Sequence, residues 1–291
     1  MLIDLWRKFL LSLHLRSIFM ALVFVAAVSV SAAGQNAAPS GGSGDKKPEQ
    51  PSGKSSNKSS KKDKLDNATA EQITETTILL YAIPGGRNTM EQIRKTSAEK
   101  GKITLTAPDG TISTAKYQRW TIWGNTLGEE KIRLEQEFPN AKYSLIHAEK
   151  KVFGVFNDSV FEPRDDARVS FENQIYRGLD GLLRYKENES TLELMGREKY
   201  MGVEYFMIDV TDKGGRKTRY FVSVKTFRVM MLDYEENGSK YRRKFYDYNY
   251  AQGILVPYIT ALWIDDKLRE EISVGTITFG QKVDEGLFAA N

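Results

Sequence analysis

The sequence lacks cysteine entirely and contains only two histidines, His14 and His147, among its 291 residues. Without cysteine the chain has no disulfide framework, no thiol nucleophile, no cysteine-ligated metal and no site for lipidation on sulfur. Two histidines, one of them close to the N-terminus, also exclude a histidine-rich metal site. The folded part must therefore be stabilised by an ordinary hydrophobic core.

Recognisable catalytic motifs are absent as well. The sequence contains no nucleophile elbow of the G-x-S-x-G type, no phosphate-binding P-loop and no H-E-x-x-H zinc motif. Acidic pairs such as Glu129–Glu130 and Asp165–Asp166 fall in turns or at predicted helix starts, where carboxylates are ordinarily solvated or capping. Glycoside hydrolysis instead requires two carboxylates that converge across a cleft. We predict that the protein is not an enzyme and needs neither metal nor cofactor.

The first 33 residues have the pattern of a secretory signal peptide. Arg7, Lys8 and Arg16 provide positive charge, residues 18–27 are apolar, and small residues follow as far as Ala33. The apolar run is shorter than the ~20 residues that a membrane-spanning helix needs. We expect cleavage and a periplasmic location. If the segment were retained, it would anchor the protein in the inner membrane.

Residues 34–66 differ in composition from the rest of the chain. They are rich in Gly, Ser, Lys and Pro, contain no aromatic residue, and have no aliphatic side chain larger than alanine before Leu65. Such a segment buries too little apolar surface to offset its ordering entropy, so we predict a disordered tether. The tether and the signal segment also hold the positive charge, because residues 66–291 sum to about −2 of the total of +4. A nucleic-acid partner is therefore not expected.

Residues 67–291 form one domain in which strand patterns dominate. Short runs rich in β-branched and aromatic residues alternate with Asp-Gly, Asn-Gly and Gly-Gly turns, which is typical of an antiparallel meander. Strands are predicted at residues 102–106, 112–124, 131–138, 143–147, 152–156, 191–198, 203–210, 219–224, 226–234, 241–250, 254–264 and 268–279. Helices are predicted at residues 68–83, 90–100 and 165–186.

Several predicted strands are apolar on both faces. Residues 205–208, 229–232 and 254–259 do not alternate between polar and apolar side chains. A sheet with one solvated face should alternate. Another layer of structure, or a ligand, must therefore cover the second face. Pro257 lies inside one of these strands, where it favours an edge or a bend because it lacks a ladder donor.

The last fifty residues resemble a known family. The strand opening Gly253-Ile-Leu-Val-Pro257 and the closing segment Val283-Asp-Glu-Gly-Leu-Phe288 resemble the C-terminal end of the LolA/LolB-like superfamily of periplasmic outer-membrane lipoprotein-sorting proteins. The resemblance implies a mainly β, α+β fold for residues 67–291. Its strongly curved antiparallel sheet would form an incomplete β-barrel, with two or three helices covering the open concave side. The long basic tether departs from the family pattern.

The resemblance also implies a function. The protein would bind a lipid or a lipoprotein acyl chain without covalent chemistry, between the sheet and the lid helices. It would be a monomer and would work with membrane-associated transport partners. Aromatic and methionine side chains line acyl-chain cavities well because they need no polar partner. The candidate liners are Trp120, Trp123, Phe206, Ile208, Met230, Leu232 and Trp263. The same residues would equally suit a closed core, and the alternative function is an envelope-associated structural or protein-interaction module.

Overall fold

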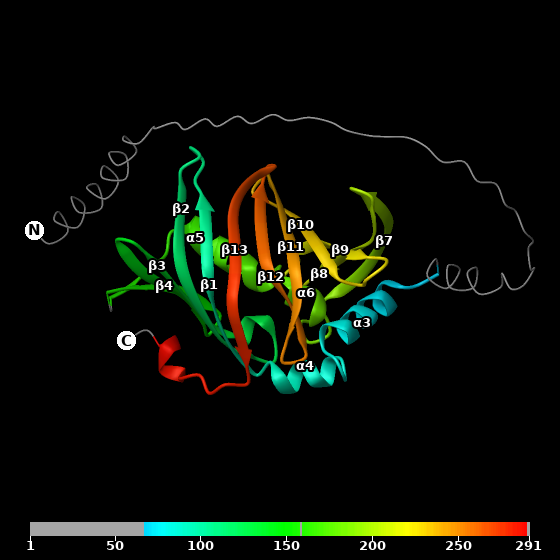
Figure 1. The fold of residues 1–291 in the computed structure, drawn as a ribbon, viewed down its shortest axis with the longest axis horizontal. Helices are drawn as coiled ribbons and strands as arrows, with labels where there is room; N and C mark the ends of the chain where they lie inside the picture. The colour runs from blue at the N-terminus through cyan, green and yellow to red at the C-terminus, as the bar shows by residue number, and fades with distance from the viewer. Residues whose placement is uncertain (1–66, 158, 290–291) are drawn as a thin grey trace, which may run out of the picture. The chain divides into compact units, whose positions relative to one another are not determined.

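The computed structural model describes residues 67–157 and 159–289, so the predicted signal peptide and tether lie outside the described residues. In the described part, thirteen strands form one antiparallel sheet in the order β6-β5-β4-β3-β2-β1-β13-β12-β11-β10-β9-β8-β7. The sheet is curved and unclosed, and the helices lie against one side of it (Figure 1). The predicted mainly β fold with helices on the open concave side is confirmed.

The strand order explains how the chain builds this sheet. It starts in the middle at β1, runs outward to the edge at β6, crosses by helices to the opposite edge at β7, and returns inward to β13 beside β1. The strands are β1 (Thr96–Thr106), β2 (Ile112–Ile122), β3 (Lys131–Phe138), β4 (Ala141–Ala148), β5 (Lys151–Phe156), β6 (Ser159–Phe161), β7 (Thr191–Tyr200), β8 (Val203–Thr211), β9 (Lys217–Ser223), β10 (Val229–Glu236), β11 (Ser239–Ala251), β12 (Ile254–Ile264) and β13 (Lys267–Phe279). The helices are α3 (Ala70–Tyr81), α4 (Arg87–Ile93), α5 (Asp165–Tyr176) and α6 (Leu179–Leu183), with 3₁₀ turns η1 (Leu127–Glu129) and η2 (Glu285–Phe288).

Helix α3 begins with a capping box. The Thr69 hydroxyl accepts the Gln72 backbone N–H at 3.2 Å, and the Gln72 side chain accepts the Thr69 N–H at 3.0 Å, which satisfies two otherwise unpaired donors. The inward face of the helix presents Ile73, Ile78 and Tyr81, each only 1% exposed. Burial of this apolar face holds α3 on the concave side of the sheet.

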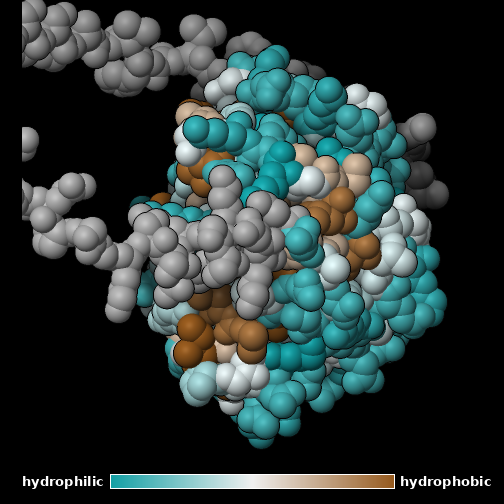
Figure 2. Space-filling view, turned by 90° about the vertical axis from the view of Figure 1, so that its right-hand side faces the viewer, coloured by the Kyte–Doolittle hydropathy of each residue, from teal (hydrophilic) through white to brown (hydrophobic). Residues whose placement is uncertain are grey.

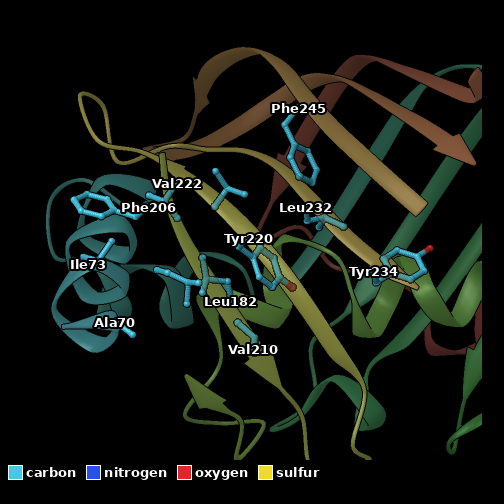
Figure 3. Packing of buried hydrophobic residues seen from close by; sticks show 12 residues of the cluster. Ala70, Ile73, Leu182, Phe206, Val210, Tyr220, Val222, Leu232, Tyr234 and Phe245 are labelled. Carbon is cyan, nitrogen blue, oxygen red and sulfur yellow. The ribbon is translucent and has the colours of Figure 1, made fainter. Parts of the chain in front are cut away.

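The core beneath α3 and α6 is closely packed. Figure 3 shows Ile73 of α3 and Leu182 of α6 beside Phe206 of β8, Tyr220 of β9 and Leu232 of β10, all inside one buried cluster. A separate cluster packs Phe171 and Ile175 of α5 against the inner faces of β2, β3 and β4. A further cluster packs Ile78 and Tyr81 of α3 with Leu183 of α6 and with Ile254 and Leu255 of β12, so the helices cover several packed clusters on the concave side.

The C-terminal segment packs on the opposite, convex face. Phe288 of η2 is 4% exposed and joins a cluster with Ile146 of β4 and Trp120 of β2. The side of the molecule that faces the viewer in Figure 2 is mainly hydrophilic but has apolar patches. Exposed apolar side chains near α3 include Leu79 and Ile83.

Two predicted helices were wrong in extent. The helix expected at residues 165–186 is divided into α5 and α6, because Gly178 adopts an extended backbone between them and a Cβ there would lie 2.6 Å from the Gln174 carbonyl oxygen. The helix expected at residues 90–100 ends at Ile93, and residues 96–100 belong to β1, paired on both sides. Pairing in the sheet overrides the local preference there. The three-residue strand β6 was not predicted.

Candidate functional site: a cavity between the sheet and helices α5 and α6

A cavity of about 200 Å³ lies between the concave face of the sheet and the α5–α6 segment. Its floor comes from β1, β2, β11, β12 and β13, and its roof from the end of α5 and from α6. The apolar lining is concentrated on β12, β13 and α6 and includes Leu179, Leu183, Ile254, Leu255, Val256, Pro257, Ile272, Val274, Ile277 and Phe279. Concave, largely apolar sites with a few polar groups are the usual form of a small-molecule site.

The floor contains a gap between two strands. Strand β12 pairs with β13 from Ile264 only as far as Ile259, which faces Ser273. Beyond that point β12 remains paired with β11 as far as Ile254, while β13 remains paired with β1 as far as Phe279. Within the described residues, positions 255–258 of β12 therefore have a free edge on the side of β13. Pro257 lies in this stretch, where its missing N–H removes no bond to β13.

The cavity reaches this free edge. Four consecutive residues of β12, 254–257, line it. Because successive side chains of a strand point to opposite faces, a cavity that touched only the inner face would be lined by alternate residues. The lining therefore includes the edge of the strand as well as its inner face. Although β12 is an inner strand, the edge or bend predicted from Pro257 is present locally.

The far end of the gap is closed by three hydrogen bonds and a β-bridge. Ala82, just after α3, bridges to Ile254, and the Ile83 N–H donates to the Gly253 carbonyl at 3.0 Å. The Gln252 side chain then joins the end of β13. Its Nε2 donates to the Phe279 carbonyl at 3.3 Å, and the Phe279 N–H donates to its Oε1 at 2.6 Å. These contacts hold together two strands that do not pair here.

The opposite end of the cavity is polar. On neighbouring strands β1 and β2, Glu99 faces Arg119 and Ser97 faces Thr121, and all four side chains line the cavity. The Tyr117 hydroxyl donates to the Glu99 carboxylate. Arg119 makes no hydrogen bond, ion pair or ring contact with any of residues 67–157 and 159–289. The other two arginines of the lining, Arg94 and Arg243, each form an ion pair.

An ion pair spans the cavity between α4 and α6. Arg94 donates to both carboxylate oxygens of Asp180, at 2.9 and 2.8 Å, and its guanidinium lies 3.9 Å from the Trp123 ring centroid. The Nε of Arg94 is buried and has no acceptor among the described residues. The pair ties the roof helix to the start of β1, and one donor beside the cavity is left over.

A second, more deeply buried ion pair ties the end of α6 to the sheet. Arg184 donates to the Glu130 carboxylate and also to the carbonyls of Gly124, at 2.6 Å, and Asn125, at 3.2 Å. The side chains of Arg184 and Glu130 are only 6% and 5% exposed. Burial, and then the nearby Asp180 carboxylate, raise the pKa of Glu130 to about 7, while the guanidinium of Arg184 acts in the opposite direction.

The residues predicted to line a cavity are divided between several places. Trp123 lines the cavity, beneath the guanidinium groups of Arg94 and Arg184. Phe206, Ile208 and Leu232 lie on the same concave side, but they are at most 1% exposed and belong to the packed core under α3. Figure 3 shows Phe206 and Leu232 in this core.

The other three predicted residues lie on the convex face. Trp120 packs against the C-terminal cluster, and Met230 packs with Tyr205 and Phe221. Trp263 faces Arg242 on the neighbouring strand, and the Lys244 ammonium lies 4.6 Å from its ring centroid. The structure therefore brings Trp123 to the cavity and places these three apart from it. Binding of a ligand by any of the seven stays a prediction.

Sequence reasoning missed the polar residues of the cavity. Arg94, Arg119 and Asp180 lie in no motif. One signal was available, because Tyr117, Arg119 and Thr121 alternate along one face of a predicted strand whose other members are buried. An arginine on the buried side of a strand marks either an ion pair or a binding site.

Several solved structures share this fold. The crystal structure of a DUF1329 family protein from Desulfovibrio piger matches with a TM-score of 0.56 and 13% identity over 77% of this chain and 98% of that chain. A LolA superfamily protein from Nitrosomonas europaea matches with a TM-score of 0.54 and 12% identity over 76% and 98%. No protein-family profile and no curated protein matches the sequence. The likeness predicted from the C-terminal segment is thereby confirmed in three dimensions: the chain has the fold of the LolA superfamily.

Proposed function

We propose that the protein is a periplasmic, non-catalytic binding protein for an acyl chain of a lipid or lipoprotein, which it holds between the sheet and helices α5 and α6. The observation that supports this most directly is the apolar end of the cavity, which continues to the free edge of β12. Apolar surface left in contact with water is unfavourable. An acyl chain covers it and contributes about 0.8 kcal/mol for each buried methylene.

Loading requires the roof to move. A cavity of about 200 Å³ is smaller than the roughly 300–1,000 Å³ of typical ligand sites, so a long chain needs more room than is present. Helix α6 has only five residues and is attached at both ends by ion pairs, Arg94–Asp180 and Arg184–Glu130. We infer that displacement of α6 opens and closes the site, and that the gap between β12 and β13 admits the far end of the chain.

The periplasmic location in this proposal comes from the signal peptide predicted in the first 33 residues. The predicted signal peptide directs the protein to the periplasm, and a LolA-type fold suits exchange of acylated cargo with membrane-associated partners there. Among the described residues, no helix has both the length and the apolar character needed to cross a membrane.

A second candidate is a protein-interaction module built on the same fold. The observation that favours it is the edge strand β6, which is three residues long and exposes Val160 and Phe161 beside the exposed Phe156 of β5. An apolar edge strand with free backbone groups can accept a strand from another protein.

One pair of variants separates the two candidates. Val274 lies on the cavity floor, whereas Val160 is 46% exposed on β6. Binding of a fluorescent alkyl probe to the purified full chain should be abolished by Val274→Glu and unchanged by Val160→Glu. In a second experiment, lipid extracted from the unmodified protein should be identified by mass spectrometry. If no lipid is extracted and Val274→Glu binds the probe normally, the acyl-chain function is refuted. Loss of a co-purifying protein on Val160→Glu alone would favour the second candidate.

A further inference from the structure

The cavity is amphipathic along one direction, from β2 across β1 and β13 to β12. At the β1–β2 end it is lined by Ser97, Glu99, Arg119 and Thr121. At the β12–β13 end its lining is aliphatic and aromatic and meets the free strand edge. A simple hydrocarbon would fit only one of these ends. A molecule with a polar head and one apolar chain matches both.

Arg119 indicates the charge of that head. A guanidinium that lines a cavity is costly to desolvate unless it is paired, and Arg119 has no hydrogen bond or ion pair to the described residues. The carboxylate that faces it across the strands, Glu99, already accepts the Tyr117 hydroxyl. Arginine presents a planar set of five donors that suits carboxylate and phosphate groups.

A second arginine lies in the same lining. Arg94 uses both terminal nitrogens on Asp180, and its buried Nε has no acceptor among residues 67–157 and 159–289. Arg94 and Arg119 both line this cavity, as does the Glu130 carboxylate. The other carboxylates there are engaged, Asp180 by Arg94 and Glu130 by Arg184.

We propose that the ligand is a single-chain amphiphile with an anionic head, of which a fatty acid is the simplest case. Its head group binds the Arg119 guanidinium, and its chain crosses β13 toward the gap between β12 and β13. One chain is specified because the polar lining lies at one end of the cavity and the apolar lining at the other. This inference rests on the proposed acyl-chain function and adds the chemistry of the head.

The test compares laurate with dodecanol, which has the same chain length and no charge. Each is used to displace a fluorescent alkyl probe from the unmodified full chain and from Arg119→Gln. Laurate should bind the unmodified protein more tightly than dodecanol. Arg119→Gln should weaken laurate about tenfold to a hundredfold, the range of a charge-assisted hydrogen bond, and leave dodecanol unchanged. Dodecyl phosphate in a parallel titration distinguishes a phosphate head from a carboxylate.

Three further variants control for indirect effects. Lys116→Gln removes a positive charge from the same strand at an exposed position on the other face and should leave the preference for laurate intact. Glu99→Gln removes the carboxylate opposite Arg119. It should strengthen the binding of laurate and leave the binding of dodecanol unchanged. Arg119→Lys keeps the charge without the planar donors and should retain part of the preference, which gives a readout if Arg119→Gln does not fold.

The outcomes separate this inference from the proposed function. Equal binding of laurate and dodecanol by the unmodified protein, with no effect of Arg119→Gln, overturns the anionic head and leaves the acyl-chain site in place. Absence of binding of either ligand overturns both. A loss of laurate and dodecanol binding together in a folded Arg119→Gln variant assigns Arg119 a structural role and likewise overturns the inference.

Discussion

Arg184 joins helix α6 to the sheet, and the cost of removing it can be worked out from its contacts. Its partner Glu130 is 5% exposed, so Arg184→Met leaves a buried carboxylate without its guanidinium. The carbonyls of Gly124 and Asn125 lose their donor as well. Removing one partner of a buried ion pair costs about 3–5 kcal/mol, against about 0–1 kcal/mol for an exposed pair. We expect the free energy of unfolding to fall by the larger amount.

The assay is urea unfolding followed by tryptophan fluorescence, because Trp123 lies 4.4 Å below the Arg184 guanidinium. Glu130→Gln combined with Arg184→Met should be more stable than Arg184→Met alone, because the uncompensated charge is gone. Arg164→Met is the control, since Arg164 is 77% exposed and its ion pair with Asp166 should contribute little.

The pH dependence gives a second check on the same variant. Burial and the Asp180 carboxylate raise the pKa of Glu130 to about 7 in the folded chain, against an ordinary value of 4.5, so ionisation of Glu130 disfavours the folded state above that pKa. Protonation removes this penalty as the pH falls from about 7 toward 4.5. Without Arg184 the pKa of Glu130 in the folded chain rises further, whereas below about pH 7 Glu130 is protonated in both folded proteins. The charge-dependent part of the Arg184→Met deficit should therefore grow above pH 7 and disappear as the pH falls to about 7. A deficit that does not grow above pH 7, or a double variant no better than Arg184→Met there, would refute the reasoning.

Three further predictions follow from local geometry. Gln252→Ala removes both contacts to the Phe279 backbone, and should lower stability by about 1–2 kcal/mol and speed release of a bound alkyl probe in stopped flow. Burial lowers the pKa of His147 below 6.5, so the folded protein loses up to about 1.4 kcal/mol per pH unit as the pH falls from 6.5 toward that lower value; His147→Phe should flatten this part of a thermal-midpoint profile. Gly101→Ala places a Cβ 2.1 Å from the Ser273 carbonyl oxygen, and should cost about 1–3 kcal/mol in urea unfolding by forcing β1 away from β13.

Each of these predictions has its own control or contrary result. Gly275→Ala is the matched control for Gly101, because its nearest atom would be the Lys100 carbonyl oxygen at 3.4 Å, an ordinary contact, and it should be nearly neutral. An unchanged release rate in Gln252→Ala would show that the end of the gap does not limit release. A pH profile of His147→Phe that keeps the slope of the parent protein would assign that slope to other groups.

Strands could be predicted well because their turns are encoded locally. Strand β3 (Lys131–Phe138) and strand β12 (Ile254–Ile264) coincide with the predicted ranges, since each is bounded by turn residues and rich in β-formers. Residues 96–100 have no such pattern, and only their pairing with Ile122 to Gln118 and with β13 makes them a strand. The α5–α6 break likewise depends on a contact, because the Gly178 carbonyl accepts the Tyr220 hydroxyl at 2.7 Å.

The candidate site was less accessible from sequence. Met230 follows Val229 at a position where the register between β9 and β10 shifts, and the simple alternation that predicts its face fails there. Trp120 precedes the inward Thr121 and so faces outward, a result that follows from the two-residue period once one neighbour is placed. Aromatic content alone does not distinguish a cavity wall from a convex surface that another segment covers.

The sequence by itself determined what local chemistry sets: a cysteine-free, mainly β fold, the positions of most strands, and a C-terminal segment that resembles the LolA/LolB-like superfamily. The tertiary structure alone decided where β12 and β13 separate, which arginines of the cavity have partners, and which face each aromatic residue occupies. The physical reason is the separation along the chain of the residues that interact. Turns and alternation depend on residues a few positions apart, whereas the pairing of β1 with β13 and the contact of Arg94 with Asp180 join positions 86 or more residues apart.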